Sequence, residues 1–241
     1  NGLEIKGNAK VKNLPIQVKL SGPFAKNEAK FLEIDFNLSE KVLKMLPDGL
    51  PDINISGSTP AKLDIKFLEN SKVEFELASN LRGVELGYLP IGWVKAIDRE
   101  AELKVSGTTG DEFVLNNISL SSPDLVLVGS AVKQKDEKFM LNFEKLALED
   151  VFDIQLVLEK DGTIEVTGGE LDMQEFIKLP LVKSSSKKST PLTINLDELK
   201  LHEEQVITRF TAALEATGKG KFSGSLNDLA SFDGVLERVE E

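Results

Sequence analysis

Apolar and polar residues alternate with a period of two along most of the chain. In the segment 31–39, for example, leucine, isoleucine and phenylalanine occupy the even positions, and acidic residues and asparagine stand between them. Successive side chains of a β-strand point to opposite faces, so this alternation predicts strands with one apolar and one polar face. We expect on the order of a dozen such strands, paired as an antiparallel sheet that is wet on one face.

The turn at Lys160-Asp161-Gly162 fixes the register of two of these strands. A two-residue Asp-Gly turn would set Leu158 opposite Glu165 and mix an apolar with a charged side chain on one face. A three-residue loop with its glycine in a left-handed conformation instead sets Leu158 opposite Ile164. We predict the three-residue loop. The same reasoning predicts a three-residue loop at 69–71, which brings the apolar side chains on both sides of it onto one face.

Helical patterns are few. Ser39 is suited to cap a short helix over 40–46, and a second helical turn is predicted over 173–178, stopped by Pro180. The lysine- and serine-rich segment 183–191 is predicted to be a flexible loop that crosses between strands. We expect the whole chain, 1–241, to form one continuous domain.

A small hydroxyl residue followed by glycine ends, or nearly ends, several of the alternating runs. Glycine suits the bends and β-bulges at which a twisted sheet changes course, so we expect the sheet to bend at these points. The pairs are Ser21-Gly22, Ser56-Gly57, Ser106-Gly107, Thr167-Gly168 and Ser223-Gly224.

The apolar faces of the predicted strands need a cover. Burying one such side chain is worth about 1.5–3 kcal/mol, so leaving all of them in water would forfeit more than the roughly 5–15 kcal/mol by which a typical protein is stable. Two short helices cannot cover the sheet, so it must fold over on itself as a sandwich, a barrel or a U-shaped gutter. A sandwich buries its apolar side chains, whereas a gutter leaves an apolar trough that requires a ligand or a partner. Composition alone does not separate these forms.

Charge and composition exclude several classes of function. The 241 residues carry 29 basic and 40 acidic side chains, a formal charge of −11, and show no basic stripe of the kind that binds nucleic acid. The same acidic excess argues against docking on anionic lipid headgroups. No apolar run reaches the roughly 18–20 residues of a membrane-spanning helix. The chain has no cysteine, so it has neither disulfides nor thiolate metal sites.

Side chains suited to catalysis are scarce. The one histidine, His202, is out of phase with the neighbouring leucines and is predicted to be solvated on the polar side of a strand. No phosphate-binding loop is present, and the glycines within 218–221 are better explained by a hairpin turn. Adjacent carboxylates such as Glu203 and Glu204 would point to opposite faces of a strand, which is poor geometry for acid–base catalysis. We therefore predict no enzymatic activity, no cofactor and no metal site.

Several stretches of the chain resemble the AsmA-like bacterial envelope proteins, especially the YhdP-type branch and the related domain of unknown function in large proteins of this kind. They are LPDGLPDINISGSTPAKLDIKF at 46–67, ASNLRGVELGYLPIGWVKAIDREAELKVSG at 78–107, GTIEVTGGELDM at 162–173, PLTINLDELKLHEEQVI at 191–207 and GKGKFSGSLND at 218–228. The resemblance spans most of the chain in order and rests on sheet pattern and small motifs, not on catalytic residues. It implies an elongated, twisted sheet folded into a U-shaped, taco-like groove.

The resemblance also implies a function. The chain would be a periplasmic fragment of an inner-membrane-anchored envelope protein, and its apolar groove would carry phospholipid acyl chains between the inner and outer membranes. The implied partners are phospholipid and other segments of the same full-length protein, with the membrane anchor outside this fragment.

The residues expected to line the groove are apolar members of the alternating strands, and for each of them an ordinary core position is an equal alternative. They are Ile34, Phe36, Leu63, Ile65, Phe67, Phe75, Leu77, Leu103, Val105, Phe113, Leu115, Phe139, Leu141, Phe143, Ile154, Leu156 and Leu158.

Two other functions are kept as alternatives. One is a structural scaffold that assists outer-membrane assembly or binds another envelope protein by adding a strand at an open sheet edge. The other is a sugar-binding or enzymatic role with Trp93 and Tyr88 as a stacking platform. The segment 89–93 is more simply explained as a turn packed on the sheet.

Overall fold

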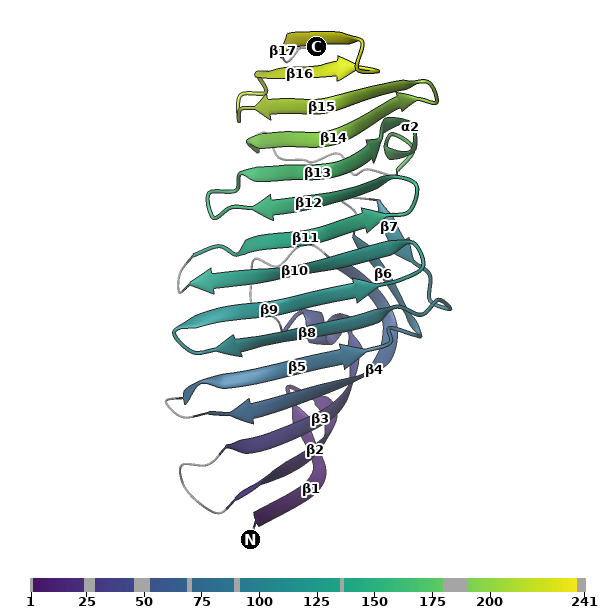
Figure 1. The fold of residues 1–241 in the computed structure, drawn as a ribbon. Helices are drawn as coiled ribbons and strands as arrows, with labels where there is room; N and C mark the ends of the chain where they lie inside the picture. Colours follow the sequence, from purple (N-terminus) through teal and green to yellow (C-terminus); the bar gives the residue numbers. More distant parts are fainter. Residues whose placement is uncertain are drawn as a thin grey trace. The chain divides into compact units, whose positions relative to one another are not determined.

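The computed structural model describes residues 2–23, 29–45, 53–68, 71–88, 92–134, 137–179 and 190–237. These residues form a mixed 17-stranded sheet and two short helices (Figure 1). The mostly-β prediction is confirmed, with more strands than expected. The strands are β1 (Gly2–Val11), β2 (Leu14–Pro23), β3 (Lys30–Ser39), β4 (Ile53–Phe67), β5 (Val73–Ser79), β6 (Val84–Tyr88), β7 (Trp93–Lys95), β8 (Glu102–Thr109), β9 (Glu112–Ser121), β10 (Leu125–Gln134), β11 (Met140–Leu148), β12 (Phe152–Leu158), β13 (Ile164–Asp172), β14 (Leu192–His202), β15 (Gln205–Leu214), β16 (Gly220–Leu226) and β17 (Ala230–Leu236).

The chain divides into two compact units. Unit 1 comprises residues 1–88, 94–123 and 130–137, and unit 2 comprises residues 89–93, 124–129 and 138–241. The expectation of one continuous domain stays a prediction.

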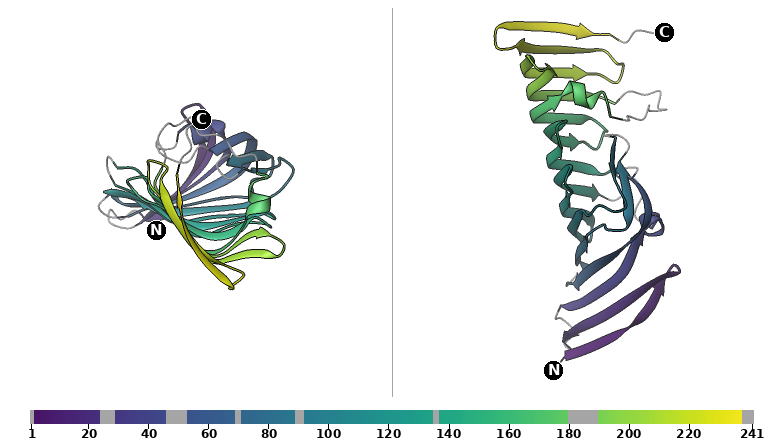
Figure 2. Two further views of the ribbon diagram at one scale, coloured as in Figure 1. Left: turned by 90° about the horizontal axis from the view of Figure 1, so that it is seen from above. Right: turned by 90° about the vertical axis from the view of Figure 1, so that its right-hand side faces the viewer.

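Unit 1 is built from strands that pair antiparallel with their neighbours along the chain. β1 pairs with β2, β2 with β3, β3 with β4 and β4 with β5, and β5 then pairs with β8 and β8 with β9. The long strand β4 has two partners on one side, because residues 62–67 pair with β5 and residues 53–57 pair with β6. Figure 2 shows the long strands of this unit curving along their length.

Unit 2 is a ladder from β11 to β17 with one change of direction. Neighbouring strands pair antiparallel except β13 and β14, which are parallel. The purely antiparallel expectation therefore does not hold at this pair. A parallel pair requires a connection that returns across the sheet, which is consistent with the predicted crossing loop. Most of that loop, 183–189, lies outside the described residues.

Both predicted turn registers are confirmed. Leu158 is opposite Ile164, and Gly162 has a φ of +94°, so the connection is the three-residue loop. The backbone N–H of Glu159 donates to the carbonyl of Thr163 over 2.9 Å and closes it. On either side of the other loop, Phe67 is opposite Val73. Side-chain alternation thus determined the pairing at both hairpins.

The Ser/Thr-Gly pairs mark irregularities in the sheet at four of their five positions. Gly57 lies where β4 passes from β6 to β3, and Gly107 lies at a register shift between β8 and β9. Gly168 adjoins a shift between β12 and β13, and Gly224 is opposite a shift in β15. Gly22 is the exception, since it sits in the regular ladder of β1 and β2.

Each helix is a single turn. The first, α1 (Glu40–Leu43), follows Ser39, but the Ser39 side chain makes no capping hydrogen bond. The end of the predicted helix, from Leu46 on, lies outside the described residues. The second, α2 (Met173–Phe176), is capped by the carboxylate of Asp172, which accepts from two backbone N–H groups. Because α2 contacts both β13 and β14, the connection between the parallel strands begins on that side of the sheet.

Candidate functional site

The strand register brings the predicted residues of unit 1 onto one face, called here the apolar face. One cross-strand row runs through Ile34, Leu63, Leu77 and Val105, each directly opposite the next. The remaining predicted residues of this unit fall on the same face by the two-residue alternation. They are Phe36, Ile65, Phe67, Phe75, Leu103, Phe113 and Leu115.

Gly107 makes room for an aromatic pair on this face. It is opposite Phe75, and a methyl group at Gly107 would come within 3.0 Å of the tip of that ring. The Phe75 ring stacks on Phe113, with centroids 6.0 Å apart and an interplanar angle of 18°. Two of the predicted lining residues therefore contact each other over a glycine, which presents a flat apolar surface.

Unit 2 has an apolar face of the same construction. Leu141 is opposite Leu158, and the row continues through Ile164, Leu192 and Leu214. A second row starts with Phe143 and Leu156 and continues through Val166, Ile194 and Ala212. Ile154 is opposite Leu146, and Phe139 directly precedes β11. The apolar face therefore extends to β15, beyond the residues predicted. The alternation at 164–166, 192–196 and 210–214 carried that signal.

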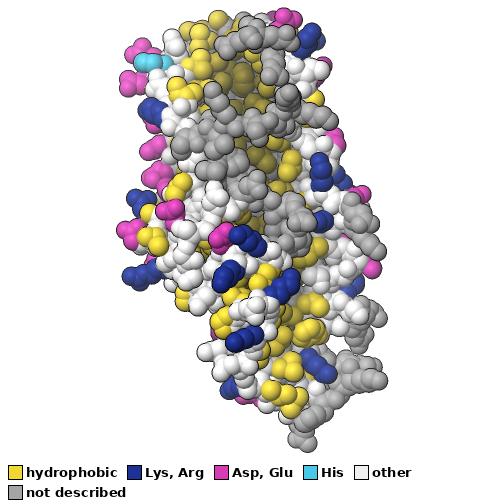
Figure 3. Space-filling model, turned by 180° about the vertical axis from the view of Figure 1, so that it is seen from behind, with side chains coloured by type: hydrophobic (Ala, Val, Ile, Leu, Met, Phe, Trp, Pro, Cys, Tyr) yellow, Lys and Arg dark blue, Asp and Glu magenta, His cyan; other side chains and the backbone are white. Residues whose placement is uncertain are grey.

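Most of the predicted residues are neither fully buried nor fully exposed. Phe139, Leu141 and Leu115 are buried, and Phe67 is 39% exposed. The other thirteen lie between these limits. Figure 3 shows hydrophobic side chains grouped together on the face that is seen from behind. An ordinary core would bury such residues almost completely, so these faces are only partly covered.

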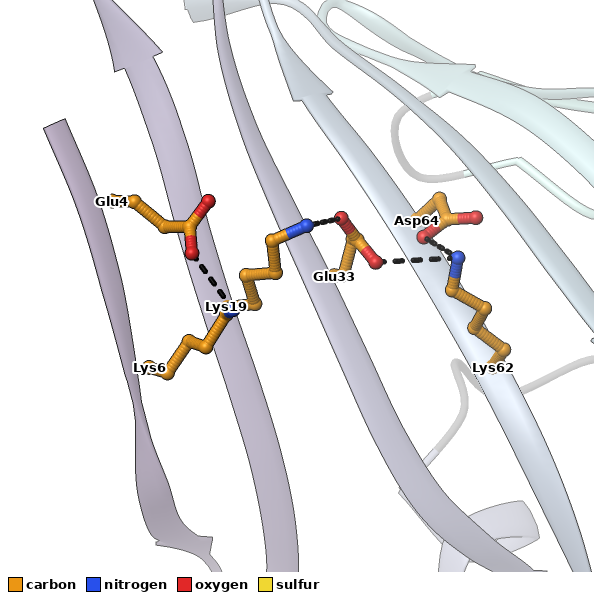
Figure 4. A network of polar contacts seen from close by, with 6 residues as sticks. All are labelled: Glu4, Lys6, Lys19, Glu33, Lys62 and Asp64. Carbon is orange, nitrogen blue, oxygen red and sulfur yellow. Dashed lines mark hydrogen bonds and ion pairs between the residues drawn. The ribbon is translucent and has the colours of Figure 1, made fainter. Parts of the chain in front are cut away.

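The opposite face of unit 1 carries a chain of ion pairs (Figure 4). The carboxylate of Glu33 accepts from Lys19 over 2.9 Å and lies 3.4 Å from the Lys62 ammonium, which is itself 3.1 Å from Asp64. The hydrogen bonds from Lys19 and Lys62 hold the pKa of Glu33 below its ordinary value. The hydrogen bond to Asp64 raises the pKa of Lys62. This face is thus a solvated, charged surface.

Unit 2 repeats the charged surface on its polar side. Lys145 contacts Asp153 over 3.1 Å, and Lys200 contacts Glu170 over 2.7 Å. The hydrogen bond to Glu170 raises the pKa of Lys200. Within the described residues, no group of three or more carboxylates or imidazoles is arranged to hold a metal ion.

One depression in unit 1 has a volume of about 800 Å³. Its walls come mainly from the polar face, with Asn8, Gln17, Asp35 and Lys62 in one cross-strand row. Of the predicted lining residues only Phe36 contributes to it. This depression is therefore distinct from the apolar face.

Lys95 is a buried lysine that the sequence pattern does not predict. Lys95 is 1% exposed, and its ammonium donates to the carbonyl oxygens of Val84 and Ala96 over 2.8 and 2.9 Å. Burial lowers the pKa of Lys95, and Asp98 opposes that effect. Trp93, the first residue of the same strand β7, is 4% exposed, so its indole is not free to stack on a sugar in solvent. Residues 89–91 of the predicted turn lie outside the described residues. The Tyr88 side chain lies outside the described residues.

The remaining polar candidates lie in exposed positions. His202 is exposed at the end of β14, as predicted. Glu203 and Glu204 were expected on a strand, but they occupy the turn between β14 and β15, because His202 already pairs with Gln205. Gly218 lies in a hairpin turn with a φ of +78°. Among the described residues, no helix is both long and apolar enough to cross a membrane.

Comparison with known proteins finds no match. No family model, curated protein or solved structure matches the chain.

Proposed function

We propose that this chain binds phospholipid acyl chains along its apolar faces, as a periplasmic segment of a lipid conduit between the inner and outer membranes of a bacterial envelope. The observation that carries the proposal is the incomplete burial of aligned apolar rows, such as Ile34, Leu63, Leu77 and Val105. Exposed apolar surface of this extent is unfavourable in water, and acyl chains would cover it. A U-shaped groove formed by the sheet is part of the same proposal.

The charged residues of the polar face also support the proposal. Its ion pairs keep that surface hydrated, and the net charge of −11 opposes adsorption on anionic headgroups. Acyl chains would thus meet one face of the sheet and water the other. Passage of a lipid along the sheet requires no bond-making chemistry, so we propose a non-enzymatic role in which other segments of the full-length protein and its membrane anchor complete the path.

Leu77 and Glu76 are neighbours on β5 with opposite orientations, and they provide the test. A photo-crosslinking phenylalanine analogue at position 77 is expected to give phospholipid adducts in cells, and the same analogue at position 76 is the matched control, because Glu76 is opposite Asp64 and Ser106 on the polar face. Native mass spectrometry of the purified chain is expected to show bound phospholipid. Equal labelling at both positions, or protein that is free of lipid and takes up no fluorescent acyl probe, contradicts the proposal.

A charge on the apolar face should displace the lipid. Leu77→Lys is expected to weaken binding of a fluorescent acyl probe by about tenfold, since it removes an apolar contact with the acyl chain, and full burial of such a side chain is worth about 1.5–3 kcal/mol. Glu76→Lys changes the charge on the other face of the same strand and is expected to leave the probe affinity unchanged. The two variants are compared at equal folded fraction by circular dichroism. Equal losses in both would attribute the effect to net charge and would contradict binding at the apolar face.

The scaffold function remains the second candidate, because every residue of β1 and five of the seven residues of β17 are exposed. A crosslinker at a strand edge distinguishes the two functions in cells. A single protein adduct favours the scaffold, and lipid adducts favour the conduit.

A further inference from the structure

The depression of about 800 Å³ in unit 1 lies where two inner strands part. β2 and β3 are paired as far as Gln17 and Asp35, and their ladder ends there. Both strands continue past this pair, β2 back to Leu14 and β3 on to Ser39, and each keeps its ladder with the strand on its other side. Pro15 lies just beyond the end of the ladder and has no backbone N–H with which to continue it.

Polar side chains of four strands line this depression. One cross-strand row crosses it where β2 and β3 are still paired, and consists of Asn8, Gln17, Asp35 and Lys62. Beyond the end of the ladder, Pro15 of β2 and Asn37 of β3 lie on the two sides of the parting, and Asn37 is opposite Pro60 of β4. The depression therefore combines polar groups with two proline rings.

Three amide side chains in the depression are available to a ligand. Within the described residues, Asn8, Gln17 and Asn37 form no side-chain hydrogen bond, and all three are exposed. Each amide carries donors and an acceptor on neighbouring atoms. In the adjacent row of the same face the side chains bind one another, as Lys19 binds Glu33 over 2.9 Å. The depression thus differs from its surroundings in offering hydrogen-bonding groups that the described protein does not use.

The carboxylate of Asp35 is available as well. Lys62 is directly opposite Asp35, but its ammonium lies 3.1 Å from Asp64 and 3.4 Å from Glu33 (Figure 4). Within the described residues, Asp35 therefore forms no ion pair. A carboxylate without a cation can accept hydrogen bonds from a ligand on both of its oxygens.

We infer that this depression binds an uncharged, polyhydroxylated ligand, namely a short oligosaccharide. Each sugar hydroxyl donates and accepts, which matches amides beside a free carboxylate. An anionic ligand would be repelled by Asp35, a cationic one would meet the ammonium of Lys10 in the same depression, and an apolar one would leave the amides unsatisfied. The rings of Pro15 and Pro60 supply apolar surface for the C–H groups of a sugar ring.

This second ligand site goes beyond the proposed function. Its polar side chains lie on the face of the sheet opposite to the apolar rows, so a sugar and an acyl chain would not compete. Sugar binding and acyl-chain binding can therefore be measured, and can fail, independently of each other.

Titrations with maltotriose and with chitotriose, followed through the side-chain amide NMR signals of the full chain, test the inference. The signals of Gln17 and Asn37, assigned by their loss in Gln17→Ala and Asn37→Ala, are expected to shift and to saturate with at least one of these sugars. Gln205 is the internal control, because it is exposed on β15 of unit 2, and its signal is expected to stay in place. Trigalacturonate, a sugar of the same length that carries carboxylates, is expected not to bind. No saturable shift with either neutral sugar, an equal shift at Gln205, or equal affinity for trigalacturonate would overturn the inference.

Substitutions in the row test where the sugar lies. Gln17→Ala and Asp35→Ala are each expected to weaken the affinity for the sugar that binds by about three- to tenfold, since each removes hydrogen bonds to it. Gln205→Ala is the matched control and is expected to leave the affinity unchanged. Both residues of the row are exposed, so the variants fold as the parent does, and circular dichroism checks this. If Gln17→Ala and Asp35→Ala bind the sugar as tightly as the parent, the sugar does not occupy this depression and the inference is wrong.

Discussion

At the scale of single residues, Lys95 is the side chain whose environment most contradicts its type. A lysine is almost never fully buried without partners, and here the ammonium is held by two backbone carbonyls of unit 1. Without the lysine, the buried carbonyl of Val84 would lose this donor, and an unsatisfied buried acceptor costs about 1–3 kcal/mol. The Ala96 carbonyl would keep the backbone N–H of Arg99 as a donor, over 3.2 Å. The lysine therefore stabilises the segment around β6 and β7 even though its own burial is unfavourable.

Lys95→Met keeps the length of the side chain and removes the donors. We expect it to lower the free energy of unfolding by about 1–3 kcal/mol, measured by urea denaturation. The matched control is Lys104→Met on β8, where the lysine is 59% exposed and its pair with Glu102 spans 3.7 Å. That control should change stability by less than about 0.5 kcal/mol. A Lys95→Met chain as stable as the parent would contradict this role of the ammonium at the Val84 carbonyl.

Glu33 is expected to make the stability of the folded chain depend on pH in acid. Its pKa is lowered in the folded chain, so its stabilising contribution is full above the ordinary value of 4.5 and is lost as the pH falls through the folded value. We expect the stability difference between the parent and Glu33→Gln to shrink as the pH falls below 4.5, measured by urea denaturation across that range. Glu85→Gln is the control, since Glu85 is exposed and forms no ion pair within the described residues. A difference that stays constant with pH would contradict the role of Glu33.

At the scale of elements, the bulges decide how the strands of unit 2 bend. Between β12 and β13 the register shifts from Asp153 to Gln155, and Gly168 and Gly169 fill the extra positions with φ near +65°. The backbone N–H of Gly169 donates to Asp197 over 2.8 Å and ties the bulge to β14. A bulge of this kind increases the local twist and bends the strand.

Gly169→Ala should disrupt this bulge. The new methyl group would collide with the carbonyl oxygen of Asp153, and the positive φ is unfavourable for alanine. We expect the free energy of unfolding to fall by about 1–3 kcal/mol, measured by thermal or urea denaturation. Gly7→Ala on β1 is the control, because a methyl group there meets nothing within 4 Å. Equal stability of Gly169→Ala and the parent would mean that the bulge can relocate.

Elements with a strong two-residue alternation could be predicted from the sequence, and those that depend on distant contacts could not. The register of Leu158 with Ile164 followed from the need to keep apolar residues together. The three-residue strand β7 is too short to show a period, and the parallel pairing of β13 with β14 depends on a connection with no pattern of its own. The Asp172 cap has a signal in the sequence, an acidic residue followed three positions later by Glu175.

The candidate site divides in the same way. Alternation placed Leu63, Leu77 and Val105 on one face because a strand fixes the face of every second residue. The exposed fraction of each side chain depends on which atoms lie above the sheet, and the alternation of residue types carries no information about those atoms. Lys95 occupies a strand position that looks polar in sequence, and only the fold shows that it is buried.

At the scale of the whole molecule, the U-shaped groove that we propose predicts an elongated particle. We expect small-angle X-ray scattering of the monomer to give a radius of gyration above the value of about 18 Å for a compact chain of this length. A measured radius at that value would mean that the apolar faces close on one another in solution.

The parallel pair of β13 and β14 has a consequence for how the protein folds. Antiparallel neighbours on either side of it join through short turns, so their contacts form between residues close in sequence, whereas the parallel pair joins residues 28 positions apart. Closing that larger loop costs chain entropy before any contact compensates for it. The hairpins of β11–β13 and of β14–β17 should therefore form early, and their docking should limit the folding rate of unit 2.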